Sequence, residues 1–482
     1  MTVCSRKEGA NFYIPEETTM TCVHFIGIGG SGLSAIARLL KESGYEVTGS
    51  DRTLSQFALD LQKEGVPVYV GHHPLNIAGA DMVIRSSAVA DDNPEVTAAL
   101  QKGIPVYKRA DFLGQLMAEK MGIAVAGTHG KTTTTAMIAW TLFAMERDPS
   151  FIVGGTLNNL KVNARAGKGN YFVIEADEYD RMFLGLKPHI AVVTNLEHDH
   201  PDCYPTFEDM YSAFQSFVDL LPVDGSLIVC AEDDGAVSLL SYARRKGLNV
   251  NSYSVQGEMT INSPQWMQAR TLKPNQRGGF DFSATTNMST AAATAVNVSL
   301  QVPGVHNVRN ALATLSVIAA LGLPLQEAAD VLSQFTGTGR RFEVRGEIDG
   351  VIVIDDYAHH PTEIRATLAG AKARYPGRRI LAVWQPHTYS RTQALFFEFS
   401  RAFGDANEVL VTEVYASREG KQEFSSAEVV SAMPHPSVRY SGSIQDTTEY
   451  LLKNLRIGDV LLVLSAGDAD QISTEVLRRL SL

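Results

Sequence analysis

The sequence predicts an α/β protein built from three domains. Two segments, one starting at Val23 and the other at Met121, each read as an apolar strand, a glycine-rich turn and a helix. A third series of apolar strands, each followed by polar residues, begins near Gly339. Strands that alternate with helices are typical of parallel sheets covered on both faces. The length of 482 residues agrees with three domains of roughly 150 residues each.

The composition narrows the functional classes. A hydrophobic content of 45% excludes a disordered chain. Forty-two Lys and Arg residues against 53 Asp and Glu residues give a net charge of −11, so bulk charge does not favour nucleic-acid binding. Any phosphate ligand must therefore be held by local groups, such as a helix N-terminus.

The chain is predicted to be cytoplasmic. It has neither a signal-peptide pattern at its start nor an apolar run of about 18 residues, so we expect no membrane association. The spacing of its cysteines fits no zinc site or disulfide framework, which agrees with a reducing compartment. These cysteines are Cys4, Cys22, Cys203 and Cys230.

The first domain is predicted at residues 21–122, after a polar extension at residues 1–20 whose Met20 is a possible true start. An apolar strand at residues 23–28 leads into the pattern GxGxxG, formed by Gly27, Gly29 and Gly32, and Ser31 is expected to cap the helix that follows. Asp51 ends the next strand, which completes a dinucleotide fingerprint and indicates a Rossmann-like domain. The fingerprint predicts a bound pyrophosphate but does not distinguish NAD from a UDP-linked compound. Ser86 and Ser87 end another strand and are further candidates to donate hydrogen bonds to phosphate.

The second domain is predicted at residues 123–337, and it opens with a phosphate-binding loop. The loop consists of Gly127, Thr128, His129, Gly130, Lys131, Thr132 and Thr133. Lys131 is placed to reach terminal phosphates and the Thr132 hydroxyl to bind Mg²⁺, as in P-loop ATPases. The match is incomplete, because Val125 stands where the pattern has its first glycine.

Acidic and histidine side chains follow two later strands of this domain. The segment YFVIEADEYD carries Glu175 and three further acids, and TNLEHDHPD carries His198, Asp199 and His200. Magnesium prefers a few carboxylates together with substrate oxygens, whereas zinc would need more sulfur or imidazole, so we favour hydrated Mg²⁺ with a triphosphate. His198 is predicted to be a simple surface histidine.

Residues 257–302 are rich in Thr, Asn and Ser, which predicts antiparallel strands added to the second domain. A clear helix follows in GVHNVRNAL. The third domain, at residues 338–482, is expected to be a Rossmann-like α/β domain, in which ligands gather at the carboxyl ends of strands. Its strands end in DDYAHHPTE, QPHTYSRT, EVYASRE and SAGDADQI.

Eight motifs in one order resemble the Mur ligase family over about residues 20–470. They are GIGGSG, AGTHGKTTTT, EADEYD, TNLEHDHPD, VPGVHNVRNAL, GRRFE, DDYAHHPTE and QPHTYSRT. Within the family they most resemble the branch that adds L-alanine to UDP-N-acetylmuramate in peptidoglycan precursor synthesis. The resemblance implies an ATP-dependent ligation through an acyl phosphate, with UDP-sugar-binding, ATP-binding and amino-acid-binding domains in that order. It suggests a monomer or weak homodimer.

The resemblance also implies roles for individual residues. Catalysis would depend on Lys131, Glu175, His200, Arg341 and His359, and the metal would be held by Thr132, Glu175 and His200. Besides the phosphate loop, ATP would contact His306, Asn310, Arg341, Asp356 and Tyr357. The UDP sugar would contact Gly29, Gly30, Ser31, Gly32, Asp51, Ser86 and Ser87. The incoming amino acid would contact His387 and Arg391.

Two departures from family patterns bear on the substrate. Residues 207–221 contain no lysine, so this segment cannot carry the carbamylated lysine of later-step relatives. Thr388 replaces an arginine found in some alanine-adding enzymes, which leaves selectivity for alanine over glycine or serine open. Three alternatives remain: a recycling ligase that adds a murein tripeptide to the same UDP sugar, a catalytically idle UDP-sugar-binding protein, and an NAD-dependent dehydrogenase.

Overall fold

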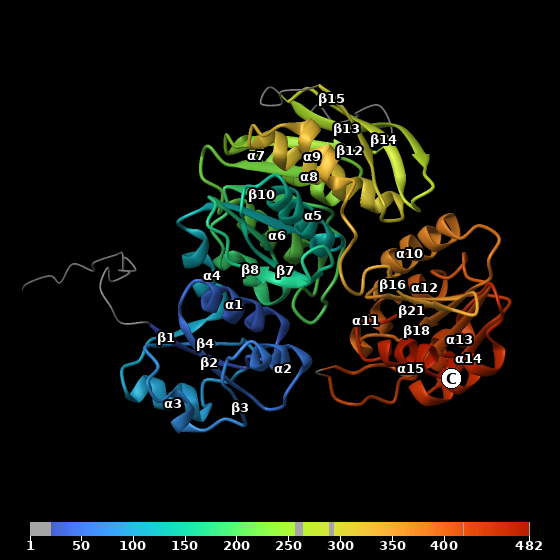
Figure 1. Ribbon diagram of the computed structural model, residues 1–482, viewed down its shortest axis with the longest axis horizontal. Helices are drawn as coiled ribbons and strands as arrows, with labels where there is room; N and C mark the ends of the chain where they lie inside the picture. Colours follow the sequence, from blue (N-terminus) through green and yellow to red (C-terminus); the bar gives the residue numbers. More distant parts are fainter. Residues whose placement is uncertain (1–20, 256–263, 289–293, 418, 482) are drawn as a thin grey trace, which may run out of the picture. The chain divides into compact units, whose positions relative to one another are not determined.

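The computed structural model describes residues 21–255, 264–288, 294–417 and 419–481 (Figure 1). The predicted extension at residues 1–20, including Cys4, lies outside them. The chain forms two compact units, which divide between Lys108 and Arg109. No helix within the described ranges has both the length and the apolar character needed to cross a bilayer. The described cysteines are Cys22, Cys203 and Cys230, and all three are free thiols.

The first unit contains a five-stranded parallel sheet in the order β3-β2-β1-β4-β5. This is the Rossmann strand order 3-2-1-4-5-6 without its sixth strand, so the predicted Rossmann-like class is confirmed. Its strands are β1 (Cys22–Ile26), β2 (Glu46–Asp51), β3 (Val68–Val70), β4 (Met82–Arg85) and β5 (Val106–Lys108). Its helices are α1 (Ser31–Glu42), α2 (Gln56–Lys63), the 3₁₀ helix η1 (Pro74–Ile77) and α3 (Pro94–Gln101).

The prediction that Ser31 caps α1 is wrong. Gly30 occupies the N-cap position with extended backbone angles, and Ser31 is already the first helical residue. The turn is closed by the backbone instead, because the Gly30 N–H donates to the Gly27 carbonyl. The first N–H groups of α1 consequently have no side-chain cap, which leaves them available to an anionic ligand.

Sequence reasoning missed a buried carboxylate in this unit. Glu95, in the first turn of α3, is fully buried and accepts hydrogen bonds from the Ser50 hydroxyl at 2.5 Å and the Asn76 amide at 2.6 Å. His24 lies 3.6 Å away and is equally buried. Burial by itself would raise the pKa of Glu95, but the hydrogen bonds from these partners lower it to about 2.

Replacing Glu95 with glutamine is expected to destabilise the first unit by about 3 kcal/mol at pH 7. Because the folded pKa lies below the unfolded value of 4.5, the stabilisation is fully present above pH 4.5. It is lost as the pH falls through 2. Native-state hydrogen exchange of the β1 and β2 amides measures the difference between variant and parent.

The matched control is Glu64→Gln, because Glu64 forms an ion pair with Arg38 at the surface and not in the core. This change should cost less than about 1 kcal/mol. A Glu95→Gln difference that stayed constant as the pH fell below 4.5 would contradict the proposed origin of the stabilisation.

The second unit begins with α4 (Arg109–Met117) and a ten-stranded sheet in the order β15-β14-β13-β12-β11-β10-β6-β9-β7-β8. The phosphate-loop strand β6 (Met121–Ala126) lies at its centre, between β10 (Ile190–Val193) and β9 (Tyr171–Glu175). On one side the parallel sheet continues with β11 (Ser226–Cys230) and β12 (Asn249–Ser254). On the other side β7 (Ser150–Leu157) runs parallel to β9 and forms an antiparallel hairpin with β8 (Val162–Arg165). The parallel arrangement brings the polar ends of β6, β9 and β10 to one edge.

The predicted antiparallel addition is confirmed for the described residues. It comprises β13 (Gln265–Pro274), β14 (Phe280–Thr286) and β15 (Ala295–Ser299). The segments at 256–263 and 289–293 lie outside the described residues. Three helices, α5 (Lys131–Ala144), α8 (Val305–Ala320) and α9 (Leu325–Leu332), share one apolar core with this sheet. The other helices are η2 (Tyr179–Gly185), α6 (Phe207–Val218) and α7 (Asp234–Arg245).

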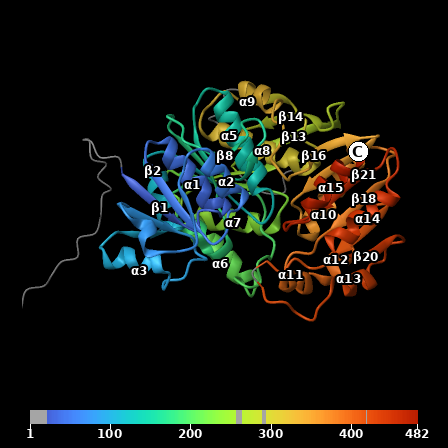
Figure 2. The same cartoon turned by 60° about the horizontal axis from the view of Figure 1, so that its bottom comes forward.

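The same unit ends in a six-stranded sheet in the order β16-β17-β21-β18-β19-β20, which is parallel except for its edge strand β16 (Figure 2). Its strands are β16 (Glu343–Ile348), β17 (Val351–Asp356), β18 (Ile380–Trp384), β19 (Glu408–Thr412), β20 (Val438–Gly442) and β21 (Val460–Leu464). One face packs against α10 (Pro361–Arg374), α12 (Phe396–Ser400) and α13 (Ser426–Ala432), and the other against α14 (Ile444–Asn454) and α15 (Asp470–Leu480). The short helix α11 (Tyr389–Ala394) follows β18.

Candidate active site

The phosphate loop runs from the end of β6 to the start of α5, and two glycines shape it. Gly127 has φ +129°, and a Cβ there would lie 2.1 Å from the Thr194 hydroxyl. Gly130 has φ +81° and is the N-cap of α5, where a Cβ would lie 2.9 Å from Asn310 Oδ1. Both positions thus require glycine for backbone and steric reasons.

The segment after β10 holds this loop in place. The Thr194 hydroxyl donates to the His129 carbonyl at 2.6 Å, and the His129 N–H donates to Asn195 Oδ1 at 2.8 Å. The Thr128 hydroxyl donates to the Glu197 carbonyl, and the Glu197 N–H donates back to that hydroxyl. Two predicted motifs, the phosphate loop and TNLEHDH, therefore form one rigid structure.

Lys131 is anchored at the base of the loop. Its ammonium group donates to the Gly127 carbonyl at 2.6 Å and to Glu178 Oε1 at 2.9 Å. Burial alone would lower the pKa of Lys131, but the neighbouring Glu178 carboxylate raises it, so the lysine stays charged. Glu178 is itself fully buried and has a lowered pKa despite burial, because Lys131 and His200 face it. Glu178 is one of the acids of EADEYD, and its ion pair with Lys131 depends on a contact that the local sequence does not reveal.

The structure brings two of the three predicted metal ligands together. The Thr132 hydroxyl donates to Glu175 Oε1 at 2.9 Å, and the Gly154 N–H donates to the other carboxylate oxygen at 2.6 Å. The third predicted ligand, His200, lies against Glu178 instead, with its Nε2 3.5 Å from Glu178 Oε1, and the same oxygen accepts from Lys131 of the phosphate loop. Burial raises the pKa of Glu175, even though Lys131 acts in the opposite direction.

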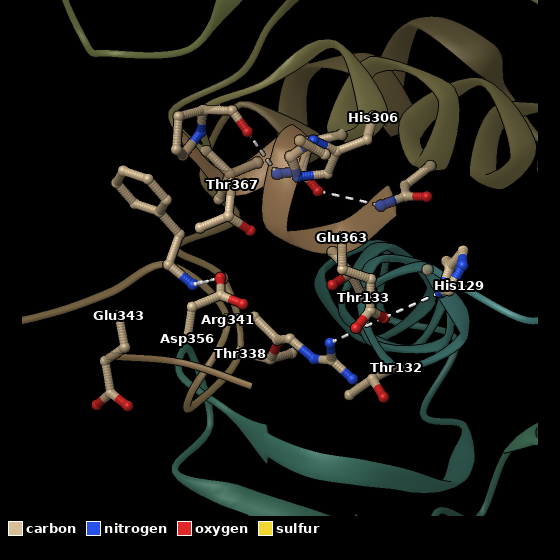
Figure 3. A pocket seen from close by; sticks show the side chains of 18 of the residues that line it. His129, Thr132, Thr133, His306, Thr338, Arg341, Glu343, Asp356, Glu363 and Thr367 are labelled. Atoms are coloured by element: carbon tan, nitrogen blue, oxygen red, sulfur yellow. Dashed lines mark hydrogen bonds and ion pairs between the residues drawn. The ribbon is translucent and has the colours of Figure 1, made fainter. Parts of the chain in front are cut away.

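A cavity of about 660 Å³ lies beside the phosphate loop, between the central sheet and α10 (Figure 3). Many of the residues predicted to bind ATP line it: His129, Gly130, Thr132, Thr133, His306, Asn310, Arg341 and Asp356. The first turns of α8 supply His306 and Asn310, whose amide donates to Asn307 Oδ1 at 3.0 Å. Burial lowers the pKa of His306 to about 4, so its imidazole is neutral.

The C-terminal domain supplies Arg341 to this cavity. Its guanidinium lies 3.6 Å from Glu363 Oε1, and Figure 3 shows both side chains beside the phosphate loop. Asp356 accepts hydrogen bonds from the Phe342 and Ala358 N–H groups, yet burial raises its pKa to about 6. Tyr357 does not line the cavity, because its ring packs against Arg341 and Arg340, each about 5.1 Å from the ring centroid. Its expected adenine contact stays a prediction.

The residues predicted to meet the amino acid gather in a second cluster. Arg391 is 5% exposed and donates to Asp199 Oδ1 at 3.0 Å, and its Nη1 lies 3.2 Å from His387 Nδ1. Burial would raise the pKa of Asp199, but Arg391 holds it well below its usual range. His359 packs edge-on against His387, and burial lowers its pKa to about 3.

The structure describes Thr388 without testing its effect on selectivity, and it corrects the prediction for His198. Thr388 adopts φ +28° at the start of α11 and lies within hydrogen-bond distance of the Ser390 hydroxyl. His198 is only half-exposed and lies 2.7 Å from the Tyr204 carbonyl, so it is a structural residue and not a simple surface histidine.

In the first unit, the glycine turn between β1 and α1 is organised by Asp51. The Gly29 N–H donates to Asp51 Oδ2 at 2.8 Å, and the Ser55 hydroxyl donates to the Gly29 carbonyl at 2.7 Å. Ser86 packs beside Gly27, whereas Gly30, Ser31 and Ser87 are exposed and Gly32 is half-buried. The predicted UDP-sugar residues are therefore grouped at this turn, except Ser87, for which no contact to the turn is seen.

Family models match almost the whole chain. The model of the Mur ligase catalytic domain matches residues 22–121, that of the Mur ligase middle domain 125–318, and that of the glutamate ligase domain 340–467. The chain belongs to the Mur ligase family. The resemblance inferred from the motifs is thus confirmed.

This Mur ligase is similar in sequence to curated UDP-N-acetylmuramate–L-alanine ligases. It is 41% identical to a UDP-N-acetylmuramate–L-alanine ligase from Desulfosudis oleivorans, over 94% of this chain and 97% of the relative. It is also 41% identical to the enzyme of that name from Nitratidesulfovibrio vulgaris, over 93% and 97%.

Solved structures agree with this placement. The UDP-N-acetylmuramate–alanine ligase of Thermotoga maritima aligns with a TM-score of 0.77 and 28% identity, covering 95% of this Mur ligase and 99% of that chain. A murein peptide ligase from Psychrobacter arcticus aligns with a TM-score of 0.69 and 26% identity, covering 95% and 98%. The three-domain α/β architecture is therefore that of solved Mur ligases.

Proposed function

We propose that this Mur ligase joins L-alanine to the lactyl carboxylate of UDP-N-acetylmuramate and converts ATP to ADP and phosphate. The observation that carries the proposal is identity of about 40% to alanine-adding ligases over nearly the full chain. Helix α6, which lacks lysine, supports it, because the carbamylated lysine of later-step Mur ligases has no place there.

The first step forms an acyl phosphate. A lactyl carboxylate oxygen attacks the γ-phosphorus of ATP, and the bond to the β-phosphate oxygen breaks to release ADP. Phosphoryl transfer depends on positioning and charge neutralisation more than on covalent help from the protein. The α5 N-terminus and Arg341 supply positive groups to the cavity, and Lys131 supplies a further positive charge at the base of the loop beside it.

Magnesium fits the pair of Thr132 and Glu175. The hydroxyl and the carboxylate are already within hydrogen-bond distance, and oxygen donors of this kind suit Mg²⁺. Burial raises the pKa of Glu175, and a bound cation would stabilise its ionised form. When bound there, Mg²⁺ neutralises negative charge on the phosphate oxygens. His200 is proposed as a further ligand, oriented by Glu178.

The second step forms the amide. The alanine amine attacks the acyl carbon, the tetrahedral intermediate collapses, phosphate leaves, and the amine loses a proton. We assign Arg391 and His387 to the alanine carboxylate. His359 has a neutral imidazole whose pKa of about 3 makes it a weak base, so its role is to orient the amine by hydrogen bonding and not to hold its proton.

Phosphate release in the presence of different acceptors tests the function. The purified chain receives ATP, Mg²⁺ and UDP-N-acetylmuramate together with alanine, glycine, serine or the murein tripeptide. Alanine-dependent release is the expected result, with glycine and serine as weaker acceptors. Release that depends on the tripeptide alone would assign the recycling reaction instead. No acceptor-dependent release would indicate a protein that binds the UDP sugar without catalysis.

A further inference from the structure

A cluster of two histidines and a carboxylate lies next to the phosphate loop, apart from the Thr132–Glu175 pair. His129 comes from the loop, Glu197 from the segment after β10, and His360 from the start of α10 in the C-terminal domain. Each residue offers a ligand atom, and these atoms all lie within 4.8 Å of one another. The three residues are called the bridging cluster below.

One nitrogen of the bridging cluster lacks a hydrogen-bond partner. His129 Nε2 is buried and bonds to no described residue, while its side chain is only 10% exposed. The nearest carboxylate oxygen, Glu197 Oε2, lies 3.7 Å away, which is too long for a hydrogen bond. A buried polar atom without a partner is unusual and calls for a ligand or ion.

The other ring nitrogen of His129, Nδ1, contacts Glu363, which is not part of the bridging cluster. His129 Nδ1 lies 3.1 Å from Glu363 Oε1 of α10, and Figure 3 shows the two side chains facing each other. A histidine that ligates a metal commonly donates its remaining N–H to a carboxylate, which fixes the ring and directs the free nitrogen at the ion. Glu363 occupies that position here.

The two remaining residues are suited to the same ion. His360 is 5% exposed, and its ring centroid lies 4.5 Å from that of His129, so the two imidazoles lie side by side. Glu197 accepts a hydrogen bond from the Thr362 hydroxyl at 3.0 Å, which positions its carboxylate. Its side chain is 38% exposed, so an ion has a path from solvent.

We propose that His129, Glu197 and His360 bind one Zn²⁺ ion, with Glu363 as the carboxylate that orients His129. Two imidazoles and one carboxylate form a donor set that suits zinc, and a water molecule would fill the fourth position. The ion connects the phosphate loop to α10.

Cobalt binding to the intact chain tests the site, because tetrahedral Co²⁺ absorbs visible light strongly and Zn²⁺ does not. Co²⁺ is titrated in excess Mg²⁺, which occupies oxygen-rich sites, and Zn²⁺ is then added to displace it. One equivalent of absorbing Co²⁺ is expected, and Zn²⁺ should abolish the signal. No visible band at saturating Co²⁺ would overturn the proposal.

The variants are chosen to remove ligands while keeping local structure. His360→Asn keeps an N-cap side chain for α10, since the His360 ring now accepts from the Thr362 N–H. Glu197→Gln keeps an acceptor for Thr362. Each should weaken Co²⁺ binding by at least about 100-fold, and Glu363→Gln by about 10- to 100-fold.

Two controls separate this site from other histidines. His189→Gln removes an imidazole that lies 3.6 Å from Asp224 at the surface, and it should leave Co²⁺ affinity unchanged. His200→Asn removes a residue assigned to the Mg²⁺ site and should also retain the band. A band lost in His200→Asn but retained in His360→Asn would place the metal elsewhere and overturn the proposal.

Discussion

The Lys131→Met variant is expected to lose at least about 10³-fold in phosphate release while still binding the UDP sugar. The loss follows because Lys131 is the charged group at the base of the phosphate loop, where its ammonium donates to the Gly127 carbonyl. Sugar binding should survive because the glycine turn with Asp51 lies in the first unit. Phosphate release and calorimetric binding of UDP-N-acetylmuramate measure the two effects.

The Lys131→Met substitution also removes the main partner of the buried Glu178 carboxylate, so its effect on stability needs a control. Glu178 would keep only His200 at 3.5 Å, and breaking a buried pair costs about 3–5 kcal/mol. The double variant Lys131→Met, Glu178→Gln should recover much of that stability without recovering turnover. Recovered turnover in the double variant, or lost sugar binding in the single one, would contradict the assigned role.

The Arg391→Met variant is expected to raise the KM for alanine by about 10- to 150-fold, which corresponds to a hydrogen bond to a charged group. The KM values for ATP and the UDP sugar should change little. The same variant should destabilise the protein by about 3–5 kcal/mol, because Asp199 is 4% exposed and would lose its guanidinium partner. Steady-state kinetics and urea unfolding measure these effects.

A second variant separates substrate binding from the structural role of Arg391. In Asp199→Asn, Arg391→Met the buried charge is gone, so stability should largely return. If Arg391 binds the alanine carboxylate, the KM for alanine stays high in this double variant. A KM that returned to the parent value would mean that the ion pair with Asp199 is the whole role of Arg391.

Much of the fold followed from local patterns. Apolar runs ending in polar residues marked the strands β6, β9, β10, β17 and β18, and the parallel arrangement then placed their ends together. The phosphate loop was recognisable from its glycine, lysine and threonine pattern between a strand and a helix, and its Gly127 and Gly130 adopt backbone angles that favour glycine. The capping of α1 was misjudged, because Ser31 is a common capping type but the chain enters the helix one residue earlier.

The ion pairs of the site were less accessible to sequence reasoning. His129 and Glu363 are 234 positions apart, and Arg391 and Asp199 are 192 apart. Nothing in the local sequence around Glu178 or Glu95 distinguishes them from solvated carboxylates, yet both are fully buried. Such pairings depend on how strand ends and helices from distant segments meet, which periodicity and residue type do not encode.

The cavity beside the phosphate loop is lined by helices and loops of the central and C-terminal domains, so the measured affinity of a nucleotide depends on how these two domains face each other. One wall carries Thr132 and Asn310, and the opposite wall carries Arg341 and Glu363. A nucleotide that contacts both walls makes all of its contacts only in those protein molecules whose walls face each other. Its apparent dissociation constant therefore equals the intrinsic dissociation constant divided by the fraction of protein molecules in that arrangement. A substitution at Gly337, which lies in the connection and itself lines the cavity, would therefore change nucleotide affinity partly by altering this population.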